Sequence, residues 1–442
     1  MSERTIWTEA QAERQLRSLE LFGMRFGLER MRRMMTALGS PERSFDTIQV
    51  LGTNGKSSTT RMIAAILEAH GLRTAAYLSP HLVSYRERLL VDGHELEQEQ
   101  FAVAIDRATW AASHVNHTLE EDDHVTQFEL LTAAALWQMV RSEVDVAVVE
   151  AGLGGRYDAT SVIEPRVTVL TNVGLEHTRW LGPTVTDIAE EKLAALRPNT
   201  TLALGEDLVA SAMAVAERVA GERDARIVRP RPADAVGALR APGAFQRRNF
   251  ALARVAAESY LQGAGIPLRE QAFAQAAAAT YVAGRLQLLE DDPPTVLDGA
   301  HNPHAVRALV ASLPEVLTRP AGRASEQAPL ALVLGVLDDK DAAGMLAALL
   351  PLSARAWFTA PPSARALPPA ALASLARQLG FEQSVCEPKP AQAFAQARNW
   401  AAEHGGAVLA TGSVYLVGEL LGQLRAAGEA LAPPGVRRSS IA

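Results

Sequence analysis

The segment with the clearest chemical pattern is Gly52-Thr53-Asn54-Gly55-Lys56-Ser57-Ser58. The apolar run Thr47–Leu51 leads into it, and a helical pattern over residues 59–69 follows, closed by Gly71. Strand, glycine-rich turn, Lys-Ser and helix form the phosphate-loop arrangement, in which backbone N–H groups and a helix N-terminus face phosphate oxygens. The sequence therefore predicts a nucleotide site here rather than an ordinary Gly-Asn turn.

The polar residues of this segment have expected parts in nucleotide binding. Lys56 would reach the β- and γ-phosphates, and the hydroxyl of either Ser57 or Ser58 would bind Mg²⁺. The general motif has a glycine where this chain has Val50, so the loop is a shorter variant.

Two further candidates follow another apolar run, Val146–Val149. Glu150 ends this run, and a carboxylate beyond a strand in a phosphate-loop protein is a candidate Mg²⁺ ligand or, equally, a cap for the next turn. The following segment, Gly152–Asp158, resembles a dinucleotide fingerprint, but Tyr157 stands where a third small residue belongs. A flexible loop that contacts substrate through residues such as Gly152 and Asp158 is the better interpretation.

Several single residues have weaker signals. His177 follows an apolar run and is either structural or a metal ligand, whereas the pattern around Lys192 is typical of a solvated helix charge. The segment Asp298–His304 has an aspartate and two histidines at the spacing of a possible transition-metal site. Its Gly, Asn and Pro residues instead predict a strand-to-helix turn, and we expect this turn to contact nucleotide or substrate. Arg285 could hold a phosphate through its planar guanidinium.

The elements that must position these residues alternate between strand and helix. Residues 8–38 have a helical pattern, and short continuous apolar runs are typical of parallel strands buried on both faces. Alternation of such strands with helices predicts an α/β fold. An acidic, proline-rich stretch near 288–294 predicts two domains, 1–288 and 289–442. The predicted strands are Thr47–Leu51, Thr74–Leu78, Val144–Val149, Val167–Leu170, Val296–Leu297, Leu330–Leu334, Ala356–Phe358 and Ala407–Ala410.

Composition narrows the class of protein. The chain has 442 residues, 48% hydrophobic and 21% charged, which suits a globular protein of two or three domains. A net charge of −7 argues against a nucleic-acid partner. Cys386 is the single cysteine, which excludes an internal disulfide. Residues 1–17 lack a secretory signal and no apolar run nears the ~18 residues of a membrane helix, so we expect a cytoplasmic protein with no membrane contact.

Taken together and in order, these segments resemble the folylpolyglutamate synthase/dihydrofolate synthase family of the Mur ligase superfamily. The resemblance implies an N-terminal phosphate-loop NTPase domain with a parallel sheet and a smaller, Rossmann-like C-terminal α/β domain. The segments that carry it are Gly52–Lys56, Ser79–Leu82, Glu150–Arg156, His177-Thr178, Glu191-Lys192, Gly284–Leu286, Asp298–Pro303, Asp339–Asp341 and Thr411–Ser413.

The resemblance also implies an activity, ATP-dependent amide ligation. A substrate carboxylate attacks the γ-phosphate of ATP, and the amine of L-glutamate then displaces phosphate from the acyl phosphate. Lys56, Arg285 and Mg²⁺ would neutralise the developing charge, and closure of a two-domain cleft would exclude water. We expect a bifunctional enzyme that adds glutamate to dihydropteroate and to folates, acts as a monomer and binds Mg²⁺ at two sites.

Residue roles carry over by position. Ser79, Glu150 and His177 match Mg²⁺ ligands, and Lys192 matches a lysine that the family carbamylates. Asn249 and Arg285 match nucleotide contacts of the N-terminal domain, and Asp298 and His301 match nucleotide contacts of the C-terminal domain. The candidates for the acceptor site, each with plain core or surface as its alternative, are Phe26, Gly27, Leu28, Arg30, Pro80, His81, Arg86 and Phe128.

Three other functions share part of this pattern. A muramyl-peptide ligase would share the loop, but only about 46 residues precede the first strand, too few for the extra N-terminal domain of those enzymes. A phosphate-loop kinase or ATPase would explain Lys56 and Glu150 but not Asp298–Pro303. A catalytically inactive nucleotide-binding protein would not require Lys56, Glu150, His177 and Lys192 all to be intact.

Overall fold

The computed structural model describes residues 7–19, 27–231, 234, 239–289, 292–317 and 328–428. The chain divides into two compact units, one of Met1–Leu239 with Arg247–Thr280 and one of Arg240–Gln246 with Tyr281–Ala442. Each unit is a sheet with helices on it, which confirms the predicted α/β class. No helix among the described residues is long and apolar enough to cross a membrane.

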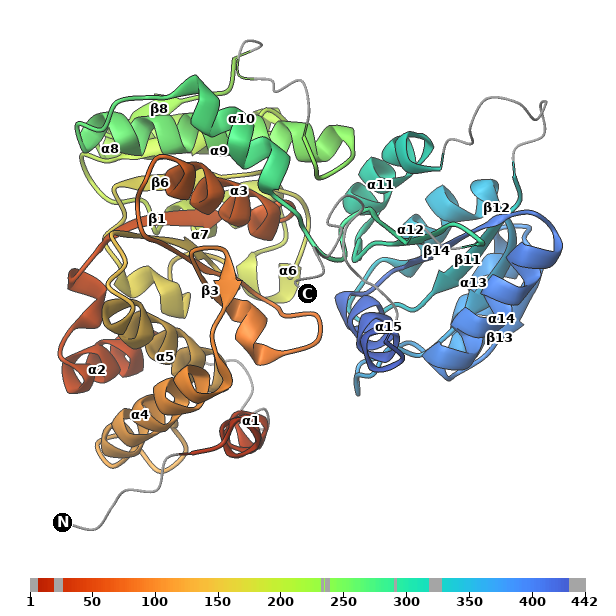
Figure 1. Cartoon of the computed structure of the whole chain (residues 1–442), viewed down its shortest axis with the longest axis horizontal. Coiled ribbons are helices and arrows are strands. Elements are labelled where there is room, and N and C mark those ends of the chain that lie inside the picture. The colour runs from red at the N-terminus through yellow and green to blue at the C-terminus, as the bar shows by residue number, and fades with distance from the viewer. Residues whose placement is uncertain are drawn as a thin grey trace, which may run out of the picture. The chain divides into compact units, whose positions relative to one another are not determined.

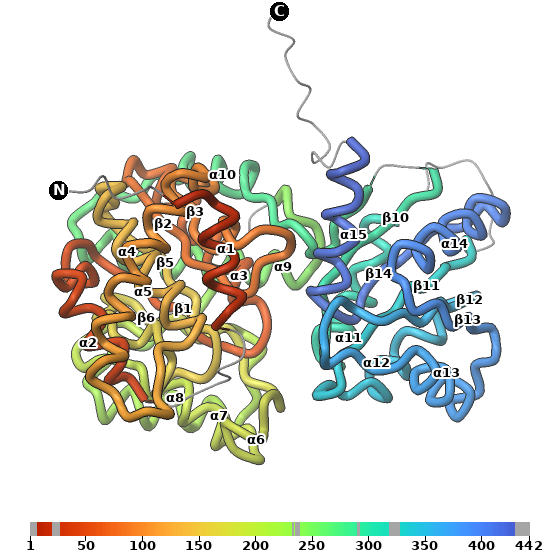
Figure 2. The backbone as a smooth tube through the Cα atoms, turned by 90° about the horizontal axis from the view of Figure 1, so that it is seen from below, coloured from red at the N-terminus to blue at the C-terminus, as the bar shows by residue number. Residues whose placement is uncertain are grey.

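The first unit is built on an eight-stranded sheet of order β4-β3-β2-β5-β1-β6-β7-β8. The pairings of β2 with β3 and of β3 with β4, at one edge, are antiparallel, and the other pairings are parallel. Figure 2 labels the central strands β2, β5, β1 and β6. The four apolar runs predicted as strands in this unit are β1, β2, β5 and β6. The strands are β1 (Asp46–Leu51), β2 (Thr74–Tyr77), β3 (Leu89–Val91), β4 (His94–Glu95), β5 (Val146–Glu150), β6 (Val167–Leu170), β7 (Thr201–Leu204) and β8 (Arg226–Val228).

Helices cover both faces of this sheet. Figure 1 draws α3 and α10 on one side of β1, and α4 and α5 on the other. The 3-10 turns are η2 (Pro41–Arg43), η3 (Tyr85–Arg88) and η4 (Ala159–Val162). The helices are α1 (Glu9–Ser18), α2 (Glu29–Leu38), α3 (Lys56–Ala69), α4 (Gln98–Asn116), α5 (Gln127–Arg141), α6 (Thr178–Leu181), α7 (Val185–Leu193), α8 (Ala210–Glu222), α9 (Ala244–Gly263) and α10 (Glu270–Ala279).

The helical pattern predicted over 8–38, with interruptions at Gly23 and Gly27, contains the helices α1 and α2 in the structure. α1 ends at Ser18 and α2 begins at Glu29. Gly27 has a φ of +125°, outside the right-handed helical region, so the chain is not helical just before α2.

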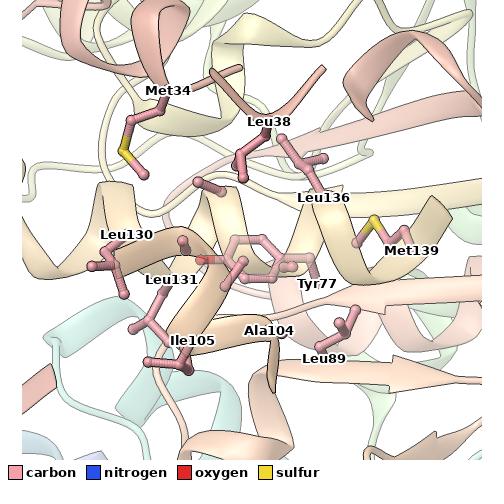
Figure 3. Packing of buried hydrophobic residues seen from close by; sticks show 14 of the residues in the cluster. Met34, Leu38, Tyr77, Leu89, Ala104, Ile105, Leu130, Leu131, Leu136 and Met139 are labelled. Atoms are coloured by element: carbon pink, nitrogen blue, oxygen red, sulfur yellow. The ribbon is translucent and has the colours of Figure 1, made fainter. Parts of the chain in front are cut away.

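One core fills the space between the sheet and α1, α2, α4 and α5. Tyr77 of β2 lies at its centre among apolar side chains (Figure 3), and its hydroxyl is hydrogen-bonded to Thr132 Oγ1 at 3.0 Å. A buried hydroxyl with a partner avoids the cost of an unsatisfied polar group. This packing fixes β2 and β5, which lead into candidate site residues.

The second unit has a six-stranded sheet of order β13-β12-β11-β14-β10-β9, in which only the pairing of β9 with β10 is antiparallel. The four apolar runs predicted here as strands are β10, β11, β12 and β14. The elements are β9 (Gln287–Leu289), β10 (Thr295–Leu297), α11 (Pro303–Val316), β11 (Leu330–Leu334), α12 (Ala342–Leu349), η6 (Leu350–Leu352), β12 (Ser353–Phe358), α13 (Pro369–Gln378), β13 (Ser384–Cys386), α14 (Pro390–Glu403), β14 (Ala407–Thr411) and α15 (Val414–Ala426).

The expected domain boundary between residues 288 and 289 falls inside the second unit. It lies within β9, which pairs with β10 through the register Leu289↔Thr295. The strand pairing, rather than the acidic, proline-rich stretch, decides to which unit residues 281–289 belong.

Candidate active site

The candidate residues of the first unit follow the carboxyl ends of four adjacent strands. β1 leads into the phosphate loop, β2 into Ser79, β5 ends at Glu150, and β6 leads into Thr171. These strands are neighbours in the order β2-β5-β1-β6 and run parallel. Their carboxyl ends therefore meet at one edge of the sheet, where open α/β sheets bind ligands.

Two glycines let the phosphate loop pass close to its neighbours. Gly52 and Gly55 have φ values of +144° and +82°. A Cβ at Gly52 would lie 1.9 Å from Thr171 Oγ1, and one at Gly55 would lie 2.6 Å from Asn249 Oδ1. Only glycine fits both the space and the backbone conformation, and the predicted nucleotide contact Asn249 is thereby placed against the loop.

The loop ends at the N-terminus of α3. Gly55 is the N-cap and no side chain caps this helix. Helix geometry leaves the N–H groups of Lys56, Ser57 and Ser58 without an acceptor inside the helix. Three N–H groups and the positive end of the helix dipole form a suitable site for a phosphate.

Two lysines donate hydrogen bonds to one carbonyl of the loop. Lys56 Nζ lies 3.0 Å from Gly52 O and 3.3 Å from Thr53 O, and Lys192 Nζ lies 2.9 Å from Gly52 O. Lys192 is only 3% exposed, which contradicts its interpretation as a solvated helix charge. Burial, with the nearby charge of Lys56, lowers the pKa of Lys192 to about 7.

A buried carboxylate links the loop to the segment after β2. Glu150 is 1% exposed, its Oε1 accepts from Ser57 Oγ at 3.0 Å, and its Oε2 accepts from the Ser79 N–H at 3.1 Å. Ser57 thus contacts Glu150, while Ser58 is buried in α3. An anionic carboxylate beside a hydroxyl at a phosphate-binding helix is the oxygen-rich donor set that Mg²⁺ prefers, so these residues fit the ion.

The third predicted metal ligand, His177, lies beside Glu176. It is the N-cap of α6, has a φ of +50°, and its Nε2 is 3.5 Å from Glu176 Oε1. Within the described part of the chain, no three His, Cys, Asp or Glu side chains gather to hold a metal ion. The structure thus brings Ser79 into contact with Glu150, and His177 lies beside Glu176.

The loop from Gly152 to Asp158 is held from several sides. A Cβ at Gly152 would lie 2.6 Å from Phe128 Cζ, and one at Gly155 would lie 2.2 Å from Lys192 O. The Asp158 carboxylate accepts from the N–H of Leu153 at 2.7 Å and from the Thr160 hydroxyl at 2.6 Å. Burial raises the pKa of Asp158. Phe128 therefore packs against this loop, and the bonds of its own Asp158 carboxylate hold it.

Two arginines predicted for the acceptor site are engaged in ion pairs. Arg30 is 6% exposed, with Nε 3.0 Å from Glu129 Oε1 and Nη1 3.0 Å from Asp123 Oδ1. Arg86 Nε donates to Glu9 Oε1 at 2.8 Å. Both guanidinium groups join elements that are distant in sequence.

The other acceptor-site candidates lie near the ends of β2 and α2. The Ser79–Pro80 peptide is cis, and His81 stacks on Tyr85 with ring centroids 4.3 Å apart. Arg88 Nε donates to His81 Nδ1 at 2.9 Å, and burial, followed by the charge of Arg88, lowers the pKa of His81 to about 3. Gly27 and Leu28 directly precede α2, and Leu28 is the N-cap of this helix. Phe26, the last of the acceptor-site candidates, lies outside the described residues.

In the second unit, three predicted residues gather around Gly299. One of them, Arg285, was predicted to be a contact of the N-terminal domain, but it belongs to the second unit. Asp298 is buried and accepts from the N–H groups of Leu286 and Ala300, each at 2.7 Å, and burial raises its pKa. His301 Nδ1 lies 2.9 Å from Gly299 O, and a Cβ at Gly299 would lie 2.2 Å from Arg285 Nη1. This arrangement is the strand-to-helix turn that the sequence predicts.

Sequence reasoning missed two side chains that hold the phosphate loop. Thr171 Oγ1 donates to Asn54 O at 2.7 Å, and Asn172 Oδ1 accepts from the Asn54 N–H at 2.9 Å. Their position directly after β6, at the same sheet edge as the other site residues, could have marked both as site residues.

Comparisons with known proteins agree with this geometry. Residues 50–199 match the Mur ligase middle domain, and residues 284–414 match the Mur ligase glutamate ligase domain. Together these matches contain the phosphate loop, Glu150, His177, Lys192, and the group around Gly299.

Two named relatives are similar over most of their length. The folylpolyglutamate synthase of Lacticaseibacillus casei is 32% identical, over 78% of this chain and 84% of that protein. The dihydrofolate synthase/folylpolyglutamate synthase of Escherichia coli is 33% identical, over 76% and 77%. The chain spans only 44% and 49% of two longer relatives from Halobacterium salinarum and Haloferax volcanii.

A solved structure supports the same assignment. The Mycobacterium tuberculosis folylpolyglutamate synthase complexed with ADP and AMPPCP has a TM-score of 0.84 and 30% identity, covering 93% of this chain and 98% of that one. Fold, domain matches and relatives together show that this chain belongs to the folylpolyglutamate synthase/dihydrofolate synthase family of the Mur ligase superfamily, whose members ligate glutamate in an ATP-dependent reaction.

Proposed function

We propose that this chain is bifunctional and adds L-glutamate both to dihydropteroate and to the γ-carboxyl of folates. The observation that carries the ATP-dependent part of the proposal is the phosphate loop, with Ser57 bonded to the buried Glu150 at 3.0 Å. The bifunctional name of the E. coli relative supports both activities.

Each ligation proceeds through an acyl phosphate. The acceptor carboxylate attacks the γ-phosphorus of ATP and ADP leaves. The glutamate amine then attacks the acyl carbon, loses a proton, and inorganic phosphate leaves. Because an anion attacks an anion, Lys56 and the N–H groups at the start of α3 must hold and neutralise the phosphates. A bound Mg²⁺ supplies further positive charge on the phosphate oxygens.

Two metal sites are part of the proposal. Ser57, Ser79 and Glu150 would hold the first ion, since their oxygens suit Mg²⁺. His177 and a carbamylated Lys192 would contribute to the second. Carbamylation joins CO₂ to the neutral amine with loss of a proton, and the lowered pKa of Lys192, about 7, favours the neutral amine. The carbamate anion would then lie close to the charge of Lys56.

Contacts in the second unit are proposed to serve the same reaction. Arg285 and His301 would contact the nucleotide, with Asp298 holding the turn that carries them through its bonds to Leu286 and Ala300. The match to the glutamate ligase domain over residues 284–414 supports a role of this turn in ligation.

The test is phosphate release with ATP, Mg²⁺ and L-glutamate, with either dihydropteroate or a reduced folate as acceptor, and with mass detection of products. We expect a one-glutamate mass gain with both acceptors. Turnover with only one acceptor would disprove bifunctionality, and release without glutamate would disprove ligation.

Lys56→Ala, set against Lys389→Ala as a control at an exposed lysine, ties the activity to the loop. We expect Lys56→Ala to lower turnover by about 10²-fold or more, because it removes a charge that neutralises the phosphates. Equal activity of the two variants would contradict the assigned role of Lys56.

A further inference from the structure

Both backbone groups of Asn54 are held by side chains from the segment that follows β6. Asn172 Oδ1 accepts from the Asn54 N–H at 2.9 Å, and Thr171 Oγ1 donates to the Asn54 carbonyl at 2.7 Å. The backbone adds a third bond, from the Thr53 N–H to Asn172 O at 2.9 Å. The first half of the phosphate loop is therefore bound to the segment that follows β6, the neighbour of β1 in the sheet.

The second half of the loop has a different set of donors. From Lys56 onward the chain is α3, whose first N–H groups have no acceptor within the helix. The loop is thus divided: the N–H groups of Thr53 and Asn54 are bonded to Asn172, and those of Lys56, Ser57 and Ser58 can face an anion.

Glycines on both sides of the held residues make this anchoring necessary. Gly52 and Gly55, which both have a positive φ, flank Thr53 and Asn54. Glycine gives a chain more conformations than any other residue. A loop that samples many conformations pays the entropy of ordering when its ligand binds. Fixing the loop beforehand reduces that cost and so strengthens binding.

We propose that Thr171 and Asn172 are positioning residues for the nucleotide, which act through Asn54 by holding the phosphate loop in its binding conformation. Neither side chain is assigned a contact with the phosphates. The inference rests on the proposed nucleotide-binding role of the loop.

Two variants remove the two side-chain bonds separately. Asn172→Ala removes the acceptor for the Asn54 N–H. Thr171→Val removes the donor to the Asn54 carbonyl with almost no change of shape, so this variant is expected to fold. The measurements are the dissociation constant of Mg²⁺-AMPPNP, the KM for ATP and kcat at saturating ATP, and the melting temperature.

The chain offers a matched control for each variant. Asn116 Oδ1 accepts from the Val125 N–H at 2.9 Å, as Asn172 does from Asn54, and Thr200 Oγ1 donates to Arg197 O at 2.7 Å. Asn116→Ala and Thr200→Val break bonds of the same type in the same unit but away from the loop. These control variants show how much of a change in nucleotide affinity results from a general loss of stability.

We expect Asn172→Ala to weaken AMPPNP binding and raise the KM for ATP about tenfold, equal to about 1.4 kcal/mol. Thr171→Val should weaken binding several-fold, and kcat at saturating ATP should stay within about threefold for both. The controls should lower the melting temperature by similar amounts and leave nucleotide affinity within about twofold.

The positioning role would be overturned if Thr171→Val bound AMPPNP as tightly as the wild type and Asn172→Ala either did the same or failed to fold. The proposed function of the loop would then still stand. Loss of affinity in the controls equal to that in the variants would also overturn the positioning role. If the wild-type protein fails to bind AMPPNP, both this inference and the proposed function of the loop are overturned.

Discussion

At the scale of single residues, adjacent hydroxyls in the loop have different surroundings. Ser57 Oγ donates to Glu150 Oε1 at 3.0 Å, whereas Ser58 is buried in α3. We expect Ser57→Ala to raise the Mg²⁺ concentration for half-maximal activity by about tenfold, since it removes a hydroxyl that is both a proposed Mg²⁺ ligand and a partner of Glu150. Ser58→Ala is the matched control and should shift it less than about twofold.

The measurement is initial rate against Mg²⁺ concentration at saturating ATP. If Ser58→Ala were the variant with the larger shift, Ser57 would not be the hydroxyl at the metal.

The buried amine of Lys192 predicts a pH dependence of stability. Its pKa is lowered to about 7 in the folded protein from 10.5. Between these pH values the unfolded chain binds the proton and the folded protein does not, so stability rises with pH over this window. The rise is up to about 1.4 kcal/mol per pH unit.

Urea unfolding at several pH values from 7 to 9, in CO₂-free buffer, tests this. We expect Lys192→Met to lose the rise and Lys389→Met, a control at an exposed lysine, to keep it. A wild-type slope equal to that of Lys192→Met would show that Lys192 is not titrating in this window.

At the scale of elements, Arg30 joins α2 to α5 inside the first unit. Its guanidinium bonds to Glu129 and Asp123, each at 3.0 Å. Arg30→Met would leave the buried carboxylate of Glu129 without its cation, and we expect it to lower the free energy of unfolding by about 3–5 kcal/mol. The measurement is urea unfolding at pH 7.

The control is Arg33→Met, because Arg33 lies on the same helix and pairs with Glu29 at the surface. It should change stability by less than about 1 kcal/mol. If Arg30→Met instead kept its stability and only raised the KM for folate, the arginine would be a substrate contact, as its position in the sequence first suggested.

The structure of these elements also explains what sequence patterns can and cannot predict. Continuous apolar runs predicted β1, β2, β5 and β6 because both faces of a parallel sheet exclude water. β3 and β9 have only three residues each and pair antiparallel, so no such run marks them. The partners of Arg30 lie 93 and 99 residues away, and spacing carries no information on such contacts.

Like the fold, the candidate site could be predicted from the sequence only in part. Gly52–Lys56 and Glu150 are recognisable because residue type and position after a strand coincide. Lys192 looked solvated because its helix is rich in charge, yet it is 3% exposed. Thr171 and Asn172 carry no motif, and their bonds to Asn54 depend on the pairing of β6 with β1.

At the scale of the whole molecule, the chain forms two units with separate cores. It enters the second unit at 240–246, returns to the first, and enters the second again at 281. The acidic, proline-rich stretch at 290–294 predicted a single crossing. Composition marks a linker, but only packing shows that residues 240–246 belong with the second unit, where Phe245 packs against its core.

Each unit has candidate residues that follow the carboxyl ends of strands, the phosphate loop after β1 in one and Asp298 and His301 after β10 in the other. The central claim is that these residues serve phosphorylation of an acceptor carboxylate before glutamate is joined to it. Isotope transfer tests this step directly, because the acyl phosphate leaves one carboxylate oxygen on the released phosphate.

The measurement uses an acceptor with both oxygens of its reacting carboxyl labelled with ¹⁸O, together with ATP, Mg²⁺ and L-glutamate. Mass spectrometry of the released inorganic phosphate gives the outcome. We expect one ¹⁸O atom in each phosphate released. Phosphate that carries no ¹⁸O, at the same rate of glutamate addition, would contradict a reaction through the acyl phosphate.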